Sequence, residues 1–243
     1  MTTIQVLNRD ASFDETVLFN IRKADAIFFE GGDQSRYISW WTGTEVQTLI
    51  QGKVNNVTIG GTSAGLAILG NWIFTAEYGS IDSYEAMANP YSPAVDIGNA
   101  LIKIPYLDTI LIDTHFQERN RMGRLTVFLA RILMDNNLPS VDIPIVRVLG
   151  VNEPTGIILN VTSGDIRLVG EGHAYLCESE HSPNVCKLDT PLTFTKINCT
   201  RFDIGDIYSF KTFLRPTQSG VDYVNDVVNG NFTDNNSVYG PSP

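Results

Sequence analysis

The chain has 243 residues, of which 43% are hydrophobic, and this length suits one large α/β domain or two small ones. A formal net charge of −10 repels phosphate backbones and anionic lipid surfaces, which argues against nucleic acids and membranes as partners. No uninterrupted apolar run approaches the roughly 20 residues that a transmembrane helix needs. We therefore expect a soluble, enzyme-sized domain whose ligand is small or cationic.

The first residues lack the charged and then apolar pattern of a signal peptide, which predicts a cytoplasmic protein. Two features would fit secretion instead, if the true N-terminus lies upstream. One is a group of three cysteines, Cys177, Cys186 and Cys199. The other is a set of five glycosylation sequons, at Asn56, Asn160, Asn198, Asn231 and Asn235. A sequence rich in Asn and Thr produces sequons by chance, and an odd cysteine count favours reduced, buried thiols.

The first two-thirds of the chain alternate short β-branched runs with helical stretches, which is the pattern of parallel βαβ units. Strands are expected at residues 4–7, 26–29, 54–59 and 109–112. Helices are expected from Ser12, whose side chain resembles a cap, and at residues 45–51, 66–74 and 119–136. The irregular stretch 77–96 is either a lid or binding loop, or a plain surface insertion.

After Pro144 the pattern changes to short strands, at residues 145–148, 155–159 and 174–176. These strands read as hairpins that close one edge of the sheet, so a mixed sheet flanked by helices is expected. We predict a single α/β domain over residues 1–218. The remaining stretch, 219–243, is rich in Asn, Asp, Gly and Ser and is predicted to be a disordered tail.

Ser63 lies where a strand is expected to turn into a helix. The stretch Gly61-Thr62-Ser63-Ala64-Gly65 has the Gly-x-Ser-x-Gly spacing of a nucleophile elbow, a sharp turn that exposes the serine hydroxyl. The N–H groups and positive dipole end of the following helix suit an oxyanion. A glycine-rich turn of this kind can equally be a phosphate-binding loop or a packing feature. The serine therefore needs a base nearby before it can be assigned as a nucleophile.

Three histidines are present, and His115 is the best placed of them to act as that base. It follows the expected strand 109–112, at the edge of the sheet that also carries Ser63. His173 and His181 look like turn residues. No His or Cys pair has ligand spacing together with carboxylates, so neither a metal site nor a cofactor is predicted.

An acid usually orients such a histidine, and the residues leave Asp113, Glu153 and Glu30 as open alternatives. A second glycine turn, Gly31-Gly32, ends the strand 26–29 and brings its backbone to the edge that carries Ser63. It is either an oxyanion donor or a simple left-handed turn. Gln34, just beyond it, could form a hydrogen bond with a substrate.

Four segments together resemble the successive motifs of the cyanophycinase family, within the serine peptidases that include aspartyl dipeptidase: residues 31–34, 61–65, 113–125 and 151–153. The resemblance covers residues 4–177, and four motifs in the right order are more specific than any one. It implies a flavodoxin-like α/β fold akin to class I glutamine amidotransferases, with serine in place of their nucleophilic cysteine. It also implies that Ser63 is the nucleophile, His115 the base and Glu153 the orienting acid, with Gly32 and Ala64 forming the oxyanion hole.

The same resemblance implies a pocket for a β-linked aspartyl-arginine unit, lined by Gln34, Asp113, Thr114, Arg119, Arg121 and Arg124. The arginines would suit the carboxylates of a polyaspartate backbone, and Asp113 would suit a substrate guanidinium. The expected substrate is cyanophycin (multi-L-arginyl-poly-L-aspartate) or a related β-aspartyl peptide, so the expected partner is an acidic or arginine-bearing peptide. Thr114 differs from the glutamine usual in the family.

Two alternatives stay open. One is an inactive binding protein that keeps the pocket, and the other is a serine hydrolase of another acidic peptide or ester. Members of the family usually begin with two further βα units that this chain lacks, and its loop 77–96 is longer than theirs. Missing strands would expose apolar faces and unpaired edges, so we expect self-association, such as a homodimer.

Overall fold

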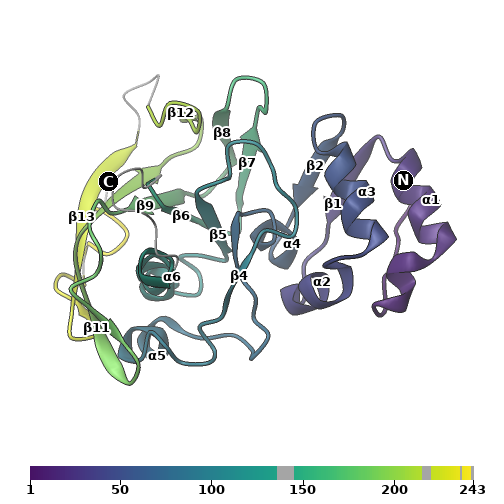
Figure 1. Ribbon diagram of the computed structural model, residues 1–243. Coiled ribbons are helices and arrows are strands. Elements are labelled where there is room, and N and C mark those ends of the chain that lie inside the picture. Colours follow the sequence, from purple (N-terminus) through teal and green to yellow (C-terminus); the bar gives the residue numbers. More distant parts are fainter. Residues whose placement is uncertain (136–144, 215–219, 236, 242–243) are drawn as a thin grey trace.

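The structure is a computed structural model that describes residues 1–135, 145–214, 220–235 and 237–241 (Figure 1). Its largest sheet is mixed and runs in the spatial order β14-β13-β11-β9-β6-β5-β3-β4, with β10 paired to β11. The bounds of these strands are β3 (Trp72–Phe74), β4 (Ile97–Asn99), β5 (Ile110–Thr114), β6 (Arg147–Val151), β9 (Ala174–Glu178), β10 (Val185–Lys187), β11 (Thr190–Phe202), β13 (Val221–Val228) and β14 (Asn231–Phe232).

The N-terminal part lies at the right of Figure 1 and has a two-stranded sheet of its own. Its core is a parallel pair, β1 (Ala26–Phe29) and β2 (Thr58–Gly61), next to the helices α1 (Glu15–Lys23), α2 (Gln34–Trp41) and α3 (Glu45–Lys53). The carboxylate of Asp14 accepts hydrogen bonds from two backbone N–H groups in the first turn of α1 and so caps this helix. The helix expected here is thus present as α1, but its cap is Asp14 and not Ser12, which belongs to a short 3₁₀ turn, η1 (Asp10–Phe13).

Residues 4–7 form no strand, which corrects the prediction for this segment. Their side chains are exposed apart from the half-buried Val6, so the short apolar run has no packed face to stabilise an extended pairing. The predicted strand at 54–59 is shifted to β2, since residues 54–57 complete the turn after α3.

Strands β3, β5 and β6 pair in parallel at the centre of the large sheet. Every residue of β5 is buried, as expected for a parallel strand covered on both faces. Leu111 faces a core that contains α6 (Met122–Asp135), while Ile110 and Ile112 face a second core with α1 and α3. The helix predicted at 119–136 is thus present as α6, and residue 136 lies outside the described residues.

The predicted helix at 66–74 was wrong for most of its length. Helix α4 (Ala64–Ala67) is a single turn, and residues 72–74 form β3 instead. A Cβ on Gly70 would lie 2.8 Å from the carbonyl oxygen of Ile110, so this glycine permits the close approach of the chain to β5. Tertiary packing of Trp72, Ile73 and Phe74, all buried, outweighs any helical tendency here.

The loop 77–96 is more ordered than its composition indicates. It contains α5 (Ser83–Ala88), whose first turn is capped by the carboxylate of Asp82. The hydroxyl of Ser83 donates to the carbonyl of Asn120 at 2.5 Å, just before α6. The segment is therefore a folded cover over α6 rather than an irregular loop.

The C-terminal part is antiparallel. Strands β7 (Thr155–Leu159), β8 (Asp165–Gly170) and β12 (Ile207–Ser209) form a three-stranded sheet, and β9, β11 and β13 extend the large sheet. The prediction of a disordered tail from residue 219 was wrong for β13 and β14, which pair with β11 and with each other. In β13, Asn225 and Val227 point into the core, an alternation that the surrounding polar residues obscure in the sequence.

The predicted α/β fold is confirmed: parallel core strands are flanked by helices, and antiparallel strands follow later in the chain. The antiparallel share is larger than the sequence pattern indicated. Among the described residues, no helix is long and apolar enough to cross a bilayer.

Two of the three cysteines are joined. Cys177 in β9 and Cys199 in β11 lie directly opposite each other and form a disulfide, so the interpretation of three reduced thiols was wrong. Cys186 is a buried free thiol, and burial raises its pKa to about 11. A buried, protonated thiol is a poor nucleophile.

This arrangement predicts the outcome of thiol titration with a disulfide-exchange dye at mildly alkaline pH. Native protein should not react, because Cys186 is buried and protonated. Protein unfolded without reductant should show one reactive thiol, and unfolded, reduced protein should show three. Three reactive thiols before reduction would contradict the disulfide.

Candidate active site

Ser63 occupies a sharp turn between β2 and α4. Its backbone has φ 51° and ψ −121°, a conformation that non-glycine residues adopt at a cost. Two residues before and two residues after it, only glycine fits: a Cβ on Gly61 would lie 2.2 Å from the carbonyl oxygen of Gly65, and a Cβ on Gly65 would lie 2.3 Å from that of Phe29. The turn is therefore a strand-to-helix elbow with the serine at its apex.

His115 and Glu153 meet Ser63 at this point. The distance from Ser63 Oγ to His115 Nε2 is 2.6 Å, and the distance from His115 Nδ1 to Glu153 Oε1 is 2.8 Å. His115 follows β5 and Glu153 follows β6, and these strands pair in parallel with Thr114 opposite Val151. The sheet thus brings three residues that lie far apart in the sequence into one hydrogen-bonded row.

The geometry distinguishes among the three acids that the sequence left open. Glu153 is the carboxylate that meets His115 Nδ1. Asp113 is buried and accepts hydrogen bonds from Arg124 instead. Glu30 is exposed on the turn after β1. The side chain of His115 is 22% exposed and that of Glu153 is 51% exposed, so solvent exposure rises from the histidine to the glutamate.

A polar network that the sequence reasoning missed holds the loop after β6. Asn152 and Gln117 exchange two hydrogen bonds of 3.2 Å each, and the Tyr175 hydroxyl donates to Gln117 at 3.0 Å. The Glu153 backbone N–H donates to the carboxylate of Glu118 at 3.1 Å. Burial raises the pKa of Tyr175 to about 12, so its hydroxyl stays protonated as a donor. The sequence signal for these residues was only their place beside His115 and Glu153.

The predicted oxyanion donors lie beside the serine. A Cβ on Gly31 would be 3.1 Å from Ser63 Cβ, which places the Gly31-Gly32 turn against the elbow. Gly32 has φ +135°, a region that favours glycine. In the described part of the chain, no hydrogen bond is formed by the N–H groups of Gly32 or Ala64. Both groups thus remain able to donate to a ligand.

Two of the predicted pocket residues pair with each other. Arg124 donates from Nε and Nη2 to the two carboxylate oxygens of Asp113, at 2.7 and 2.5 Å, and the side chains are only 3% and 4% exposed. Arg124 also donates to the Ser80 hydroxyl and the Ile81 carbonyl, and its guanidinium lies 5.1 Å from the Phe74 ring centre. Asp113, which also lies 3.5 Å from Arg121, and Arg124 are thus engaged within the protein, and their binding of substrate charges stays a prediction.

Of the other predicted pocket residues, Arg121 and Gln34 form hydrogen bonds within the protein, whereas Arg119 is exposed to solvent. Arg121 donates to the carbonyl of Thr114 at 2.6 Å, and burial lowers the pKa of its guanidinium to about 10, so it stays cationic at neutral pH. The Thr114 side chain is buried, and Gln34 donates to the carbonyl of Phe74 at 3.0 Å. Arg119 is exposed, and its side chain forms no ion pair or hydrogen bond with the described residues. Arg119 is thus the freest of the three arginines.

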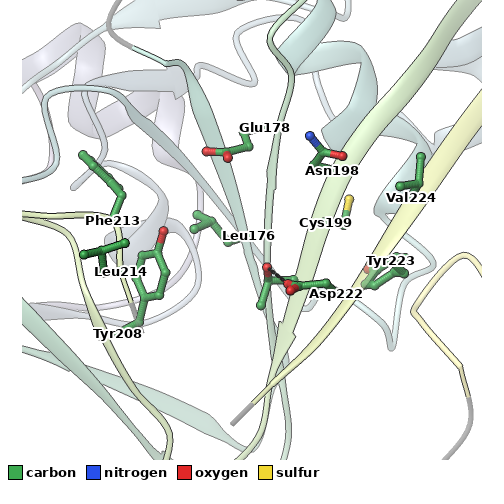
Figure 2. A pocket seen from close by; sticks show the side chains of 11 residues that line it. Leu176, Glu178, Asn198, Cys199, Tyr208, Phe213, Leu214, Asp222, Tyr223 and Val224 are labelled. Atoms are coloured by element: carbon green, nitrogen blue, oxygen red, sulfur yellow. Dashed lines mark hydrogen bonds between the residues drawn. The ribbon is translucent and has the colours of Figure 1, made fainter. Parts of the chain in front are cut away.

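A hollow in the described surface lies away from these residues. It has a volume of about 550 Å³ and lies beside β9, β11, β13 and the segment after β12. Figure 2 shows the side chains that line it, among them Glu178, Asn198 and Val224. Glu178 pairs with Arg147, at the start of β6, whereas Glu153 follows the end of β6. None of Ser63, His115 and Glu153 lines the hollow. Within the described residues, no group of three or more His, Cys, Asp and Glu side chains could hold a metal ion.

Known proteins are similar to the part of the chain that contains Ser63 and His115. Residues 1–130 match the model of peptidase family S51. The chain is 33% identical over 127 residues to the cyanophycinase of Geminocystis herdmanii (strain PCC 6308), an alignment that covers 51% of this chain and 43% of that protein. It is 26% identical over 204 residues to the cyanophycinase of Synechococcus elongatus, covering 82% of this chain and 56% of that protein. The chain thus spans about half the length of these curated relatives.

The fold also resembles a solved structure, a peptidase from an acI-B1 Actinobacterium. The TM-score is 0.53 at 14% identity, and the match covers 84% of this chain and 67% of that one. At this identity the likeness concerns the fold alone.

The buried ion pair predicts a large stability difference between two arginine variants. Replacement of Arg124 by Ala removes the two-pronged partner of the buried Asp113 and leaves it only the longer contact with Arg121 at 3.5 Å, which should lower the free energy of unfolding by about 3 kcal/mol. Replacement of the exposed Arg119 by Ala should change it by no more than about 0.5 kcal/mol. Denaturant unfolding of both variants measures the contrast, and equal stabilities would contradict a structural role for Arg124.

Proposed function

Because this chain belongs to peptidase family S51, we propose that it is a serine-type peptidase that hydrolyses an amide bond with Ser63, His115 and Glu153. The observation that carries the proposal is the hydrogen-bonded row, with distances of 2.6 Å from serine to histidine and 2.8 Å from histidine to glutamate. A nucleophile, a base and an orienting acid within hydrogen-bond reach form the arrangement that activates a weak serine hydroxyl.

In this mechanism, Ser63 Oγ attacks the carbonyl carbon of the substrate while His115 Nε2 accepts the hydroxyl proton. Glu153 accepts the Nδ1–H hydrogen bond, which fixes the tautomer of His115 and stabilises the imidazolium that forms. The imidazolium then protonates the leaving amine, and an acyl-enzyme ester remains on Ser63. Water hydrolyses this ester with His115 again acting as the base.

The negative charge on the tetrahedral intermediate needs donors that are already in place. The N–H groups of Gly32 and Ala64 support such an oxyanion hole, because they flank the serine and form no hydrogen bond within the described residues. One preorganised donor of this kind is worth about 10²–10³ in rate.

For the substrate, we propose cyanophycin or a related β-aspartyl peptide. Support comes from the relatives named cyanophycinase and from the exposed cation Arg119, whose backbone N–H donates to the carbonyl of His115 and whose guanidinium suits acidic groups. One observation favours a second candidate, a peptidase for a different acidic peptide. Asp113 and Arg124 are occupied by each other, so fewer groups remain to recognise an aspartyl-arginine unit.

Removal of the nucleophile is the first functional test. Ser63→Ala should lower the release of dipeptide from cyanophycin or from β-aspartyl-arginine peptides by about 10⁴-fold or more. Ser182→Ala, which changes an exposed serine in the loop before β10, is the matched control and should retain wild-type turnover. Unchanged turnover by the Ser63 variant would rule out the proposed mechanism.

The orienting acid gives a second test. Glu153→Gln keeps the size of the side chain but permits the wrong tautomer of His115, so kcat should fall by about 10⁴-fold. Glu118→Gln retains an oxygen that can accept the N–H of residue 153, so kcat should change only a few-fold. Thermal unfolding of both variants checks that the fold is intact. Equal kcat values for the two variants would argue against the role of Glu153.

A further inference from the structure

Four Asn-x-Thr sequons carry an asparagine whose side chain is exposed: Asn56, Asn160, Asn198 and Asn231. Two of these asparagines lie within strands, where half of the side chains of a packed sheet would point into the core. A fifth sequon, at Asn235, includes residue 236, which lies outside the described residues, and it forms no part of the inference.

The strand register places Asn198 far from the serine. Asn198 pairs with Glu178, Glu178 with Arg147, and Arg147 with Ile110, the first residue of β5. His115 lies just beyond the other end of β5. Asn198 therefore sits at the edge of the sheet opposite the candidate active site.

Two other sequons also lie at the ends of strands that point away from the candidate active site. Asn56 comes before β2, whereas Ser63 comes after it. Asn160 comes after β7, whereas Glu153 comes before it. Groups attached at these asparagines would extend away from the edge where a substrate meets Ser63.

Asn231 continues this pattern at the far end of the antiparallel strands. It pairs with Val228 at the end of β13, and Val227 pairs with Phe194 in β11. The opposite end of β11, at Phe202, pairs with Ala174 near the edge that carries Glu153.

The disulfide is a second, independent observation. Disulfides form and persist in oxidising compartments and are rare in the cytosol. Cys177 and Cys199 are joined across β9 and β11, and Cys199 is the middle residue of the sequon Asn198-Cys199-Thr200. The secretory pathway of eukaryotic cells is an oxidising compartment in which exposed sequons are modified.

The local hydrogen bonds leave the required carboxamide nitrogens usable. Asn160 accepts backbone N–H bonds through its side-chain oxygen, which a substituted amide still provides. Asn231 uses one of its two amide hydrogens, in a bond to the Asn229 carbonyl, and the other hydrogen can be replaced. Asn198 lines the hollow of Figure 2 beside Val224, which is 57% exposed, so a sugar there would also cover apolar surface.

We propose that this chain is N-glycosylated at Asn56, Asn160, Asn198 and Asn231 in an oxidising secretory compartment. The donor is an oligosaccharide linked to a lipid through pyrophosphate. The side-chain nitrogen attacks the anomeric carbon and forms the N-glycosidic bond. The bond from that carbon to the pyrophosphate oxygen breaks, the lipid pyrophosphate leaves, and the amide loses one proton.

The decisive experiment uses the protein isolated from the cells that make it, digested with peptide-N-glycosidase and mapped by mass spectrometry. Because this enzyme converts a glycosylated Asn to Asp, we expect Asp at the four positions after digestion and a faster band on a denaturing gel. Unmodified Asn at these positions in the untreated protein would overturn the proposal.

A matched pair of variants tests one site in a eukaryotic host that secretes the chain behind a cleavable signal. Asn198→Gln removes the sequon, whereas Thr200→Ser keeps both the sequon and a hydroxyl for the Asp222 carboxylate. We expect the apparent mass of the first variant on a denaturing gel to be lower than that of wild type by the mass of one glycan, and that of the second variant to equal it. Protein retained inside the host cells and protein secreted into the medium are both compared with and without peptide-N-glycosidase. Identical mobilities of wild type and both variants before digestion would contradict modification at Asn198.

Discussion

Gly61 and Gly65 approach neighbouring backbone so closely that neither has room for a side chain, and Ser63 between them is held at φ 51°. This contact fixes the direction in which the serine hydroxyl points. The Gly31-Gly32 turn touches the same elbow, because Gly31 lies against Ser63 Cβ. The strain at one residue is thus maintained by the pairing of β1 with β2, which keeps these glycine turns in register.

The base and the acid depend on a different part of the fold. Strands β5 and β6 are parallel, so their carboxyl ends deliver His115 and Glu153 to one edge. Beneath that edge, the Asp113–Arg124 pair ties the end of β5 to α6 and to the segment at Ser80 and Ile81. A buried pair of this kind contributes little net stability but is costly to break, and here it fixes the geometry around the histidine.

Local patterns singled out Ser63 and His115 as candidates, because glycine spacing and a strand end are properties of short segments. Glu153 was singled out only through a family resemblance, since the choice of acid depends on how β5 and β6 pair. The buried pairing of Asp113 with Arg124 was not predicted, because a sequence does not show which charges neutralise each other. The polar composition of β13 concealed its alternating inward residues, and the odd cysteine count concealed a cross-strand pair.

The central claim is that the fold holds Ser63 as an activated nucleophile, and labelling with a fluorophosphonate probe measures this property without assuming a substrate. Such probes react with serines that a neighbouring base activates. We predict that mass spectrometry of the labelled native protein finds the adduct on Ser63, and that His115→Ala abolishes it while the protein stays folded. A folded wild-type chain that takes up no probe, or takes it up at another residue, would contradict the account.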